Sequence, residues 1–319
     1  MIKYVGYRLL LTIPTLLGAA IITFFLLRVI PGDVVAVKLI GDGAIVSDAV
    51  IEAERQRLGL DMPLVSQFFT WLLGLLRLDL GTSMWTGRPV MVEIAQRFWV
   101  TLEVALLSTA IGVLIAVPLG TISALRRGSA IDYFSRVFTM AGLSLPGFWV
   151  GMLILLWLLN AFHWQPSLVA VPFLEDPLQN ISQLIWPALA VGYRFAAVLS
   201  RIVRSAVLEV LGEDYIRTAR AKGLARRLII VRHALRNALL PVITVVGLEF
   251  AFLFGGLVVT EQVFNLNGLG RLFVQAVANR DFILIQGMVM LFAVIYIVAN
   301  LVVDLLYAVF DPRIRYGTA

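Results

Sequence analysis

The sequence lacks the residue types from which most catalytic and metal centres are built. Its 319 residues contain no cysteine, which excludes disulfides, thiolate metal sites and a cysteine nucleophile. The two histidines, His163 and His233, lie far apart in the chain, so a zinc or iron site built on imidazole is not expected. The apolar segments contain no Ser/His pair, HExxH or paired-aspartate motif, which leaves little chemistry for an enzyme.

Charge is also scarce. Only 14% of the residues are charged and 60% are hydrophobic. In a soluble domain about 25% of the residues are charged and about 45–50% are apolar. A soluble protein of this size could not cover so much apolar surface, so lipid must be the solvent for most of the chain. In such a protein, the net charge of +6 matters less than how the basic residues are distributed among the loops, and we expect no nucleic-acid partner.

Long apolar runs predict an all-α, multi-pass membrane protein with six transmembrane helices. A helix needs about 20 apolar residues to cross about 30 Å of hydrocarbon. The fourth run is the weakest, because Arg194 interrupts it and Arg201 ends it. The whole chain, 1–319, is predicted to be one transmembrane domain with an external segment, 31–98, and a cytoplasmic loop, 205–238. The predicted spans are about 9–30, 101–125, 137–160, 184–204, 239–261 and 283–307.

The distribution of lysine and arginine predicts the orientation. The short loop 161–183 has no basic residue and carries Glu175 and Asp176, whereas basic residues cluster in the loops on the opposite side. Lysine and arginine resist translocation, so the basic side is cytoplasmic and both termini lie inside. The first run has a basic start like that of a signal peptide, but its apolar stretch continues through Leu27 and predicts an uncleaved helix.

The cytoplasmic loop has the marks of a short helix at residues 214–222. Glu213 or Asp214 places negative charge at its start and Lys222 places positive charge in its last turn, as the helix dipole favours. Gly223 suits the left-handed position that commonly ends a helix.

The spacing of side chains divides this short helix into faces. Tyr215 and Ala219 share one face with Ile216 beside them, and Arg217 and Arg220 share another. A basic loop lying on anionic lipid is one interpretation. A docking helix that inserts into the cleft of a cytoplasmic partner is the other.

Two charges lie deep in predicted spans. Glu249 is near the middle of the fifth and Arg194 is in the fourth. A charge at the bilayer centre costs around 2.5–3.5 kcal/mol on insertion scales, so such residues usually face the bundle interior. They fit either a structural ion pair or a translocation pathway, in which Glu249 would attract a substrate ammonium group.

Two further positions predict loosened or broken helices. They are Pro146-Gly147, just after Ser144, and Gly255-Gly256. Small residues in membrane bundles most often allow close helix packing. The alternative is a gate or an unwound segment that lines a pathway. The pathway hypothesis therefore groups Ser144, Pro146, Gly255 and Gly256 with Glu249 and Arg194.

Several stretches together resemble one family. The segment Asp214 to Pro241, DYIRTARAKGLARRLIIVRHALRNALLP, resembles the cytoplasmic EAA loop of ABC-importer permeases, in the form used by the dipeptide/oligopeptide/nickel importers. Arg217, Thr218 and Ala219 stand where the general loop has Glu-Ala-Ala, as in the peptide subfamily. Other similar stretches are Arg8 to Asp33, DLGTS at 79–83, SLPGFW at 144–149, Gly255-Gly256 with Glu261, GLGR at 268–271 (preceded by Asn267, where proline is usual), and Asn300 to Arg315.

The resemblance implies the first permease subunit of a pair, with the type I ABC importer fold, in a bacterial inner membrane. It implies a second permease, two cytoplasmic ATPase subunits and an extracytoplasmic substrate-binding protein as partners. ATP and Mg²⁺ would bind in the ATPases, with no cofactor on this chain, and the substrate would be a dipeptide, an oligopeptide, nickel, glutathione or a sugar. The implied ATPase-coupling residues are Tyr215, Ile216, Arg217, Thr218, Ala219, Arg220, Ala221, Lys222 and Gly223.

The residues support this division of labour independently. A P-loop needs a lysine directly after a glycine. The chain has three lysines, Lys3, Lys38 and Lys222, and none follows a glycine. The leading interpretation is therefore a non-catalytic permease subunit whose ATP is hydrolysed by other chains. The alternatives are an ion-coupled secondary transporter that needs no ATPase, and a structural subunit without a pathway.

Overall fold

The computed structural model describes residues 2–29, 35, 47–167 and 169–310, and helices make up most of these ranges. The all-α prediction is confirmed. Residue 30 of the first predicted span, Asp33, and residues 311–315 of the C-terminal resemblance lie outside the described residues. The longer helices are α1 Ile2–Val29, α5 Val90–Leu125, α6 Ala130–Ser144, α7 Gly147–Phe162, α8 Pro177–Gly212, α11 Arg236–Gly256 and α14 Phe282–Phe310. The shorter ones are α3 Asp48–Arg57, α4 Leu64–Leu76, α9 Asp214–Ala221, α10 Arg226–Leu228, the π-helix η1 Ile229–Leu235, α12 Val258–Val263 and α13 Leu269–Ala278.

In the described part of the chain, four helical stretches are long and apolar enough to cross a membrane, and the bent pair α6–α7 would make a fifth. Helix α8 contains the predicted range 184–204, but its arginines lower its apolar character. The count of six therefore stays a prediction. The four stretches are Leu10–Arg28, Val90–Leu125, Arg226–Gly256 and Phe282–Leu306.

The range 137–160 does not form one straight helix. Helix α6 ends at Ser144, and α7 begins at Gly147 with its axis turned by 103°. Leu145 is extended, with ψ 132°, because the ring of Pro146 disfavours helical geometry in the preceding residue. Helix α11 likewise ends at Gly256. Both positions at which the sequence predicts an interruption are therefore helix ends.

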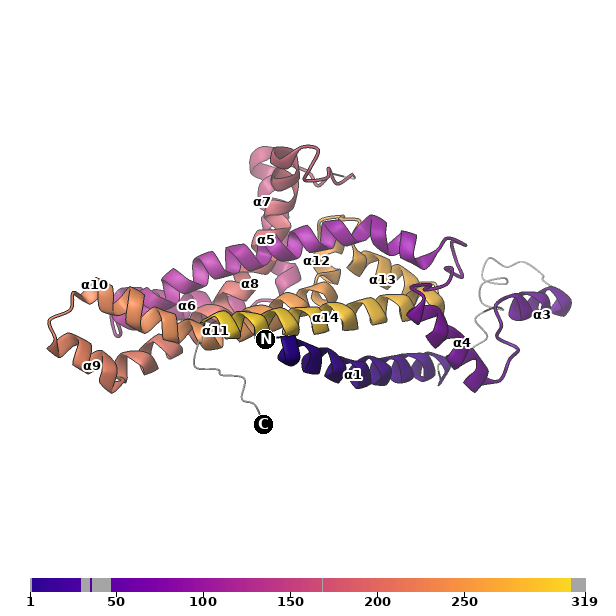
Figure 1. Cartoon of the computed structure of the whole chain (residues 1–319). Helices are drawn as coiled ribbons and strands as arrows, with labels where there is room; N and C mark the ends of the chain where they lie inside the picture. Colours follow the sequence, from indigo (N-terminus) through magenta and orange to yellow (C-terminus); the bar gives the residue numbers. More distant parts are fainter. Residues whose placement is uncertain (1, 30–34, 36–46, 168, 311–319) are drawn as a thin grey trace.

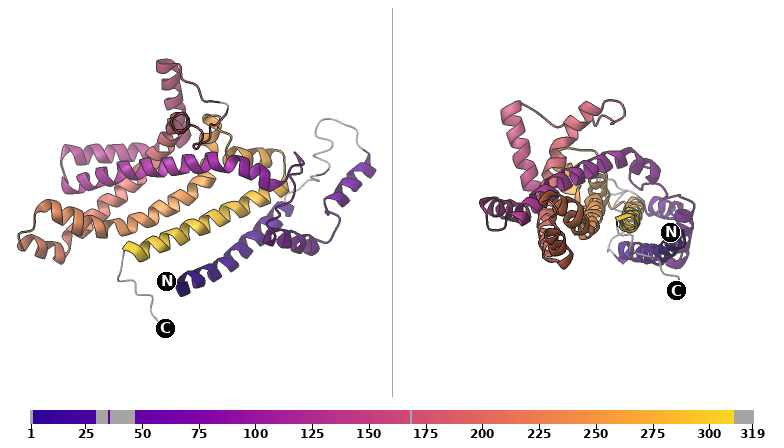
Figure 2. Two further views of the ribbon diagram at one scale, coloured as in Figure 1. Left: turned by 45° about the horizontal axis from the view of Figure 1, so that its top comes forward. Right: turned by 60° about the vertical axis from the view of Figure 1, so that its left-hand side comes forward.

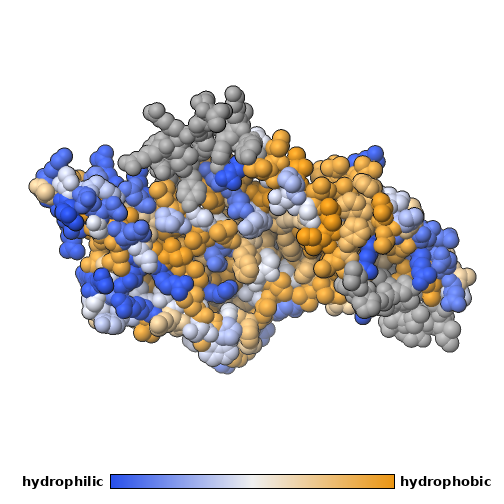
Figure 3. Space-filling view, turned by 90° about the horizontal axis from the view of Figure 1, so that it is seen from below, coloured by the Kyte–Doolittle hydropathy of each residue, from blue (hydrophilic) through white to orange (hydrophobic). Residues whose placement is uncertain are grey.

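Helices α1, α5, α11 and α14 run roughly along one axis of the molecule, and several short helices lie toward its two ends (Figure 1). Helices α9 and α10 lie at one end, and α3, α4 and α13 lie toward the other. Helix α7 stands away from the body, as the second view in Figure 2 also shows. Hydrophobic residues cover much of the middle of the surface in Figure 3, whereas hydrophilic residues gather at both ends. This arrangement suits a bundle that crosses an apolar layer.

Helices α5 and α8 form the largest contact of the bundle, and glycines permit their close approach. A Cβ atom at Gly120 would lie 2.6 Å from the carbonyl oxygen of Ser200 and 2.8 Å from Cβ of Val203. Any larger residue would separate the two helices there. The same two helices enclose a core cluster with Phe195, Leu199 and Val242, so α8 is held between α5 and α11.

Buried carboxylates fasten the loops at the end opposite α9. Glu261 in α12 is fully buried, accepts a hydrogen bond from the Thr101 hydroxyl (2.7 Å), and accepts another from the backbone N–H of Arg271 (2.9 Å). Asp281 accepts hydrogen bonds from the Ser83 hydroxyl and from the backbone N–H of Met84. Each carboxylate thereby holds a loop against a membrane helix.

We expect Gly268→Ala to destabilise the protein, because a Cβ atom at this position would overlap the Glu261 carboxylate. Overpacking of this kind costs about 2 kcal/mol. Thermal unfolding of the purified protein in detergent measures the effect as a lower midpoint temperature. Gly18→Ala is the control, because nothing lies within 4 Å of a Cβ atom there. Equal midpoints for the two variants would contradict this account of the Glu261 site.

Candidate functional site

The short helix predicted in the cytoplasmic loop is present and forms a sharp elbow. We call residues 213–225, which comprise α9 and the turns that flank it, the elbow. Helix α8 ends at Gly212, and Glu213 is extended before α9 begins at Asp214. At the other end Gly223 has a φ of +77°, the left-handed geometry predicted for it. Its N–H donates to the Arg220 carbonyl (3.0 Å), one of the hydrogen bonds that close a glycine-terminated helix.

The inner face of the elbow is attached to its own chain. Ile216 and Ala219 are buried with Ile229 and Ala234 of η1 in a small apolar cluster. These two predicted coupling residues therefore anchor α9 and do not offer a surface to another protein. The apolar contact makes α9 move with the start of the helix that continues into α11.

A polar contact strengthens the same attachment. The side-chain amide of Asn237 donates a hydrogen bond to the Tyr215 hydroxyl (2.8 Å), and that hydroxyl donates to the His233 carbonyl (3.5 Å). Tyr215 remains partly exposed. No local pattern indicates Asn237 or His233 as partners of the elbow, because they lie about twenty residues away, beyond the end of α9.

The outer face of the elbow is small, basic and exposed. Arg217 forms only an exposed ion pair with Asp214 (3.4 Å), a kind of contact that is worth little. The outer face therefore costs little to remodel and is free to meet a partner of opposite charge or a cleft. Its other exposed members are Thr218, Arg220, Ala221, Lys222 and Gly223.

The chain leaves the elbow through an unusual helix. Residues Ile229–Leu235 form a π-helix between α10 and α11. Such segments are rare and occur often at functional sites. No residue pattern in the sequence predicts this one. Its effect is to join the elbow without a loop to the helix that carries Glu249.

Most of the predicted pathway residues meet in one pocket of about 390 Å³ at the break between α6 and α7. The remaining candidate, Gly255, does not line it, and open space faces its Cα. Walls from α6, α7, α8, α11 and α12 surround the pocket. The candidates that line it are Ser144, Pro146, Arg194, Glu249 and Gly256.

The two charges in this pocket have no partner within the described part of the chain. Arg194 is exposed and Glu249 is half-buried, and neither forms a hydrogen bond or an ion pair with another described residue. The internal ion pair that the sequence left open is therefore not formed. Charges in apolar helices need water, a ligand or another protein nearby, so this pocket faces one of these.

The elbow and the pocket share two helices. Helix α8 carries Arg194 in its middle and ends at the elbow, and α11 carries Glu249 and begins where η1 ends. The elbow is attached to α8 by the chain itself and to η1 by the Ile216 cluster. A displacement of the elbow must therefore act on both helices that place charges in the pocket.

Within the described ranges, no group of three or more histidine or acidic residues is placed so that it could hold a metal ion. The structure instead has a pocket with one positive and one negative group, and two of the helices that form the pocket lead to the elbow.

Two family descriptions together match nearly all of the chain. Residues 116–316 match "Binding-protein-dependent transport system inner membrane component", and residues 1–105 match the N-terminal region of such membrane components. The first match alone covers more than half of the chain and includes both the elbow and the pocket.

Relatives of known name agree with this assignment over the full length. The chain is 43% identical over 316 residues to the glutathione transport system permease protein GsiC of Pectobacterium atrosepticum, covering 99% of this chain and 100% of that one. It is 39% identical over 343 residues to the dipeptide transport system permease protein DppB of Escherichia coli, covering 99% of each.

The fold is also known from a solved structure. An inward-facing crystal structure of the MetNI methionine ABC transporter contains a chain that superposes with a TM-score of 0.53 at 18% identity, over 69% of this chain and 97% of that one. This likeness concerns the fold alone. From the two family matches and the full-length relatives, we conclude that the chain belongs to the binding-protein-dependent transport system inner membrane components and is a permease of that family.

Proposed function

We propose that this permease forms half of the translocation pathway of an ATP-driven importer for peptides, and that the elbow couples the pathway to separate ATPase subunits. One observation carries the proposal. The elbow is fixed to α8 and α11, and these two helices place Arg194 and Glu249, both unpartnered in the described part of the chain, in the pocket at the α6–α7 break.

The outer face of the elbow would contact the ATPases. Its exposed residues include Arg217, Thr218, Arg220 and Lys222, while Ile216 and Ala219 hold α9 on the chain. Closure of an ATPase pair around ATP would push the elbow. Since α9 is attached to α8 and to η1, the push would tilt two walls of the pocket, as alternating access between the two sides of the membrane requires.

The pocket favours a solute that carries both charges. Glutathione and dipeptides, the solutes in the names of two relatives, have carboxylate and ammonium groups. Arg194 would face the carboxylate, as guanidinium groups suit carboxylates, and Glu249 would face the ammonium group. A pocket of about 390 Å³ has room for a small peptide.

The remaining subunits of the transporter would be other chains. The sequence has no lysine after a glycine and so no P-loop; ATP and Mg²⁺ would bind in two cytoplasmic ATPase subunits. A second permease would complete the pathway, and an extracytoplasmic binding protein would deliver the substrate. On this basis the chain itself is non-catalytic.

The topology completes the proposal. Six spans would cross the bacterial inner membrane, with both termini and the elbow in the cytoplasm and residues 31–98 outside. The positive-inside distribution of arginine supports this orientation, and the hydrophilic ends of the molecule match the two aqueous sides (Figure 3).

Gly223→Asp should abolish uptake and co-purification of the ATPases while leaving the protein inserted. A side chain at φ +77° strains the backbone by about 1–3 kcal/mol, which would unwind the end of α9, and the added carboxylate opposes the basic outer face. Uptake of radiolabelled glutathione and dialanine, together with pull-down of the ATPases, measures the effect. Gly87→Asp is the matched control, because Gly87 has φ +69° and open space around it but lies away from the elbow. Normal uptake by Gly223→Asp would refute the coupling role.

Glu249→Gln and Arg194→Gln should each reduce uptake by about 10- to 150-fold, because each removes one charged contact to the solute, worth about 1.5–3 kcal/mol. Expression and ATPase pull-down should not change, since neither side chain forms a contact within the described structure. Initial uptake rates at several solute concentrations test this. Glu209→Gln, an exposed carboxylate on α8 outside the pocket, is the control. Unchanged rate and specificity in both pocket variants would remove these residues from the pathway.

The absence of native cysteine permits a direct test of orientation, because an introduced cysteine is the only thiol in this chain. Leu174→Cys, at a highly exposed position between α7 and α8, should react with a membrane-impermeant maleimide in intact spheroplasts. Arg227→Cys, beside the elbow, should react only after permeabilisation. The reverse pattern would invert the proposed topology.

A further inference from the structure

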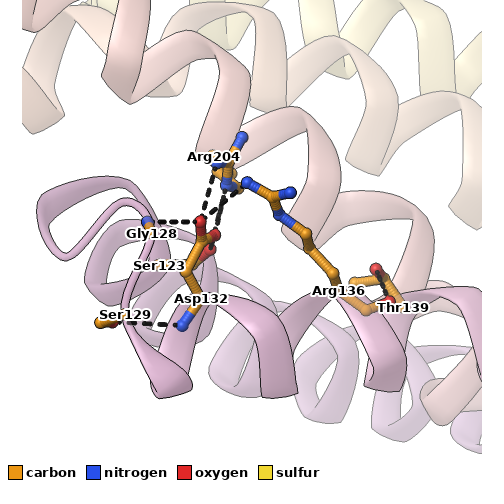
Figure 4. A network of polar contacts seen from close by, with 7 residues as sticks. All are labelled: Ser123, Gly128, Ser129, Asp132, Arg136, Thr139 and Arg204. Carbon is orange, nitrogen blue, oxygen red and sulfur yellow. Dashed lines mark hydrogen bonds and ion pairs between the residues drawn. The ribbon is translucent and has the colours of Figure 1, made fainter.

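Another buried carboxylate, Asp132, joins three helices at the end of the molecule that carries the elbow. Asp132 of α6 is fully buried and binds groups from α5 and α8 as well as from its own helix (Figure 4). The Arg204 guanidinium of α8 donates to both of its oxygens (2.9 and 3.2 Å). The Ser123 hydroxyl of α5 donates to it at 2.6 Å and Arg136 at 2.8 Å. We call these four side chains the Asp132 clamp.

The turn between α5 and α6 is shaped around the same carboxylate. The backbone N–H of Gly128 donates to Asp132 (3.0 Å), and the Ser129 hydroxyl accepts from the Asp132 N–H to cap α6. A buried carboxylate is tolerated only when it is fully bonded, and losing one partner of such a pair is costly. The end of α5, the start of α6 and the middle of the cytoplasmic half of α8 therefore form one unit.

Helix α6 remains attached to α8 up to the pocket. The Tyr193 hydroxyl donates to the Phe138 carbonyl (3.1 Å), and the two rings pack edge to face at 4.9 Å. Farther along, Gly142 lies against Ala197, with no room for a Cβ atom between them. Two residues later α6 ends at Ser144, at the wall of the pocket. Helices α6 and α8 thus form a two-helix strut from the clamp to the pocket.

A cavity of about 440 Å³ lies between the end of α5, at Ala124 and Leu125, and the elbow residues Arg220 and Leu224. The apolar cluster that contains Ile216 packs against Val210 and Leu211 of α8. A displacement of the elbow therefore reaches α8 as well as η1, and the clamp is an ionic contact that joins α8 to α6 and α5.

We propose that Asp132 is a positioning residue that transmits elbow movement from α8 to α6, and so sets the geometry of the pocket at the Ser144–Pro146 break. The inference rests on the proposed coupling function and adds a specific route to it. Without the clamp, α8 would move while α6 lagged, so ATP hydrolysis would continue with little transport.

The test uses the complete transporter reconstituted in vesicles, with radiolabelled glutathione and dialanine as probes. In Asp132→Asn, solute moved per ATP hydrolysed should fall by about tenfold, within the ordinary range of coupling between sites, while assembly and ATPase rate stay normal. In Arg204→Lys, which keeps the charge but loses the two-pronged contact, solute moved per ATP should fall less. This milder variant serves as a check in case Asp132→Asn fails to fold. Glu93→Gln, which removes a carboxylate that is also buried but is paired with Arg97 in its own helix, should retain the wild-type ratio.

A distance measurement separates transmission from a merely structural role. Spin labels at Met140→Cys on α6 and Glu209→Cys on α8 occupy exposed positions, and the chain has no other thiol. The distance between them should stay constant when ATP is added to the wild type and change in Asp132→Asn. Suppose that the transporter moves either probe with ATP, and that Asp132→Asn and Arg204→Lys both keep the wild-type ratio of solute moved per ATP and the wild-type label distance. This result would refute the transmitting role of Asp132 and leave the proposed function standing. A wild type that moves neither probe with ATP would overturn the proposed function, and the clamp with it.

Discussion

The high cost of burying a carboxylate without partners organises this molecule. In an apolar bundle an ionised group must be bonded within the protein or face water. Asp132, Glu261 and Asp281 meet this demand with hydroxyl, guanidinium or backbone N–H donors, and each thereby fastens a loop to a helix. Arg194 and Glu249 do not meet it within the described structure, and both line one pocket. The contrast between satisfied and unsatisfied charges separates the framework from the site.

The same constraint gives physical meaning to the motifs on which the family resemblance rests. In the segment from Glu261 to Arg271, glycine is needed at 268 because the Glu261 carboxylate occupies the space of a side chain. In the DLGTS stretch, Ser83 bonds Asp281 at the start of α14. In SLPGFW, Pro146 turns the chain by 103° and opens the wall of the pocket. These motifs build the pocket and the end of the molecule opposite α9, whereas the EAA-like loop builds the elbow.

The two faces of the elbow differ, because one is buried against its own chain and the other is exposed. Ile216 and Ala219 are buried against η1 and α8, so α9 cannot swing freely, and Tyr215 adds a hydrogen bond to Asn237. The outer face is nearly free of intramolecular contacts of any strength. In the proposed coupling, a partner would bind this outer face, and its push would be transmitted to the two helices with charges in the pocket.

The amino-acid sequence was enough to predict the all-α membrane class, the elbow with its glycine turn, both helix breaks, and six pathway residues, of which five line one pocket. Each rests on a local signal: apolar length, a capping pattern, a proline, or a charge in an apolar run. The packing of the helices shows what these signals could not: among the described residues Arg194 and Glu249 form no hydrogen bond or ion pair, Ile216 faces inward, Asn237 bonds Tyr215, and Asp132 bonds Arg204, 72 residues away. These facts depend on which helices lie side by side, and the periodicity of a helix fixes its apolar face without naming the neighbour that covers it.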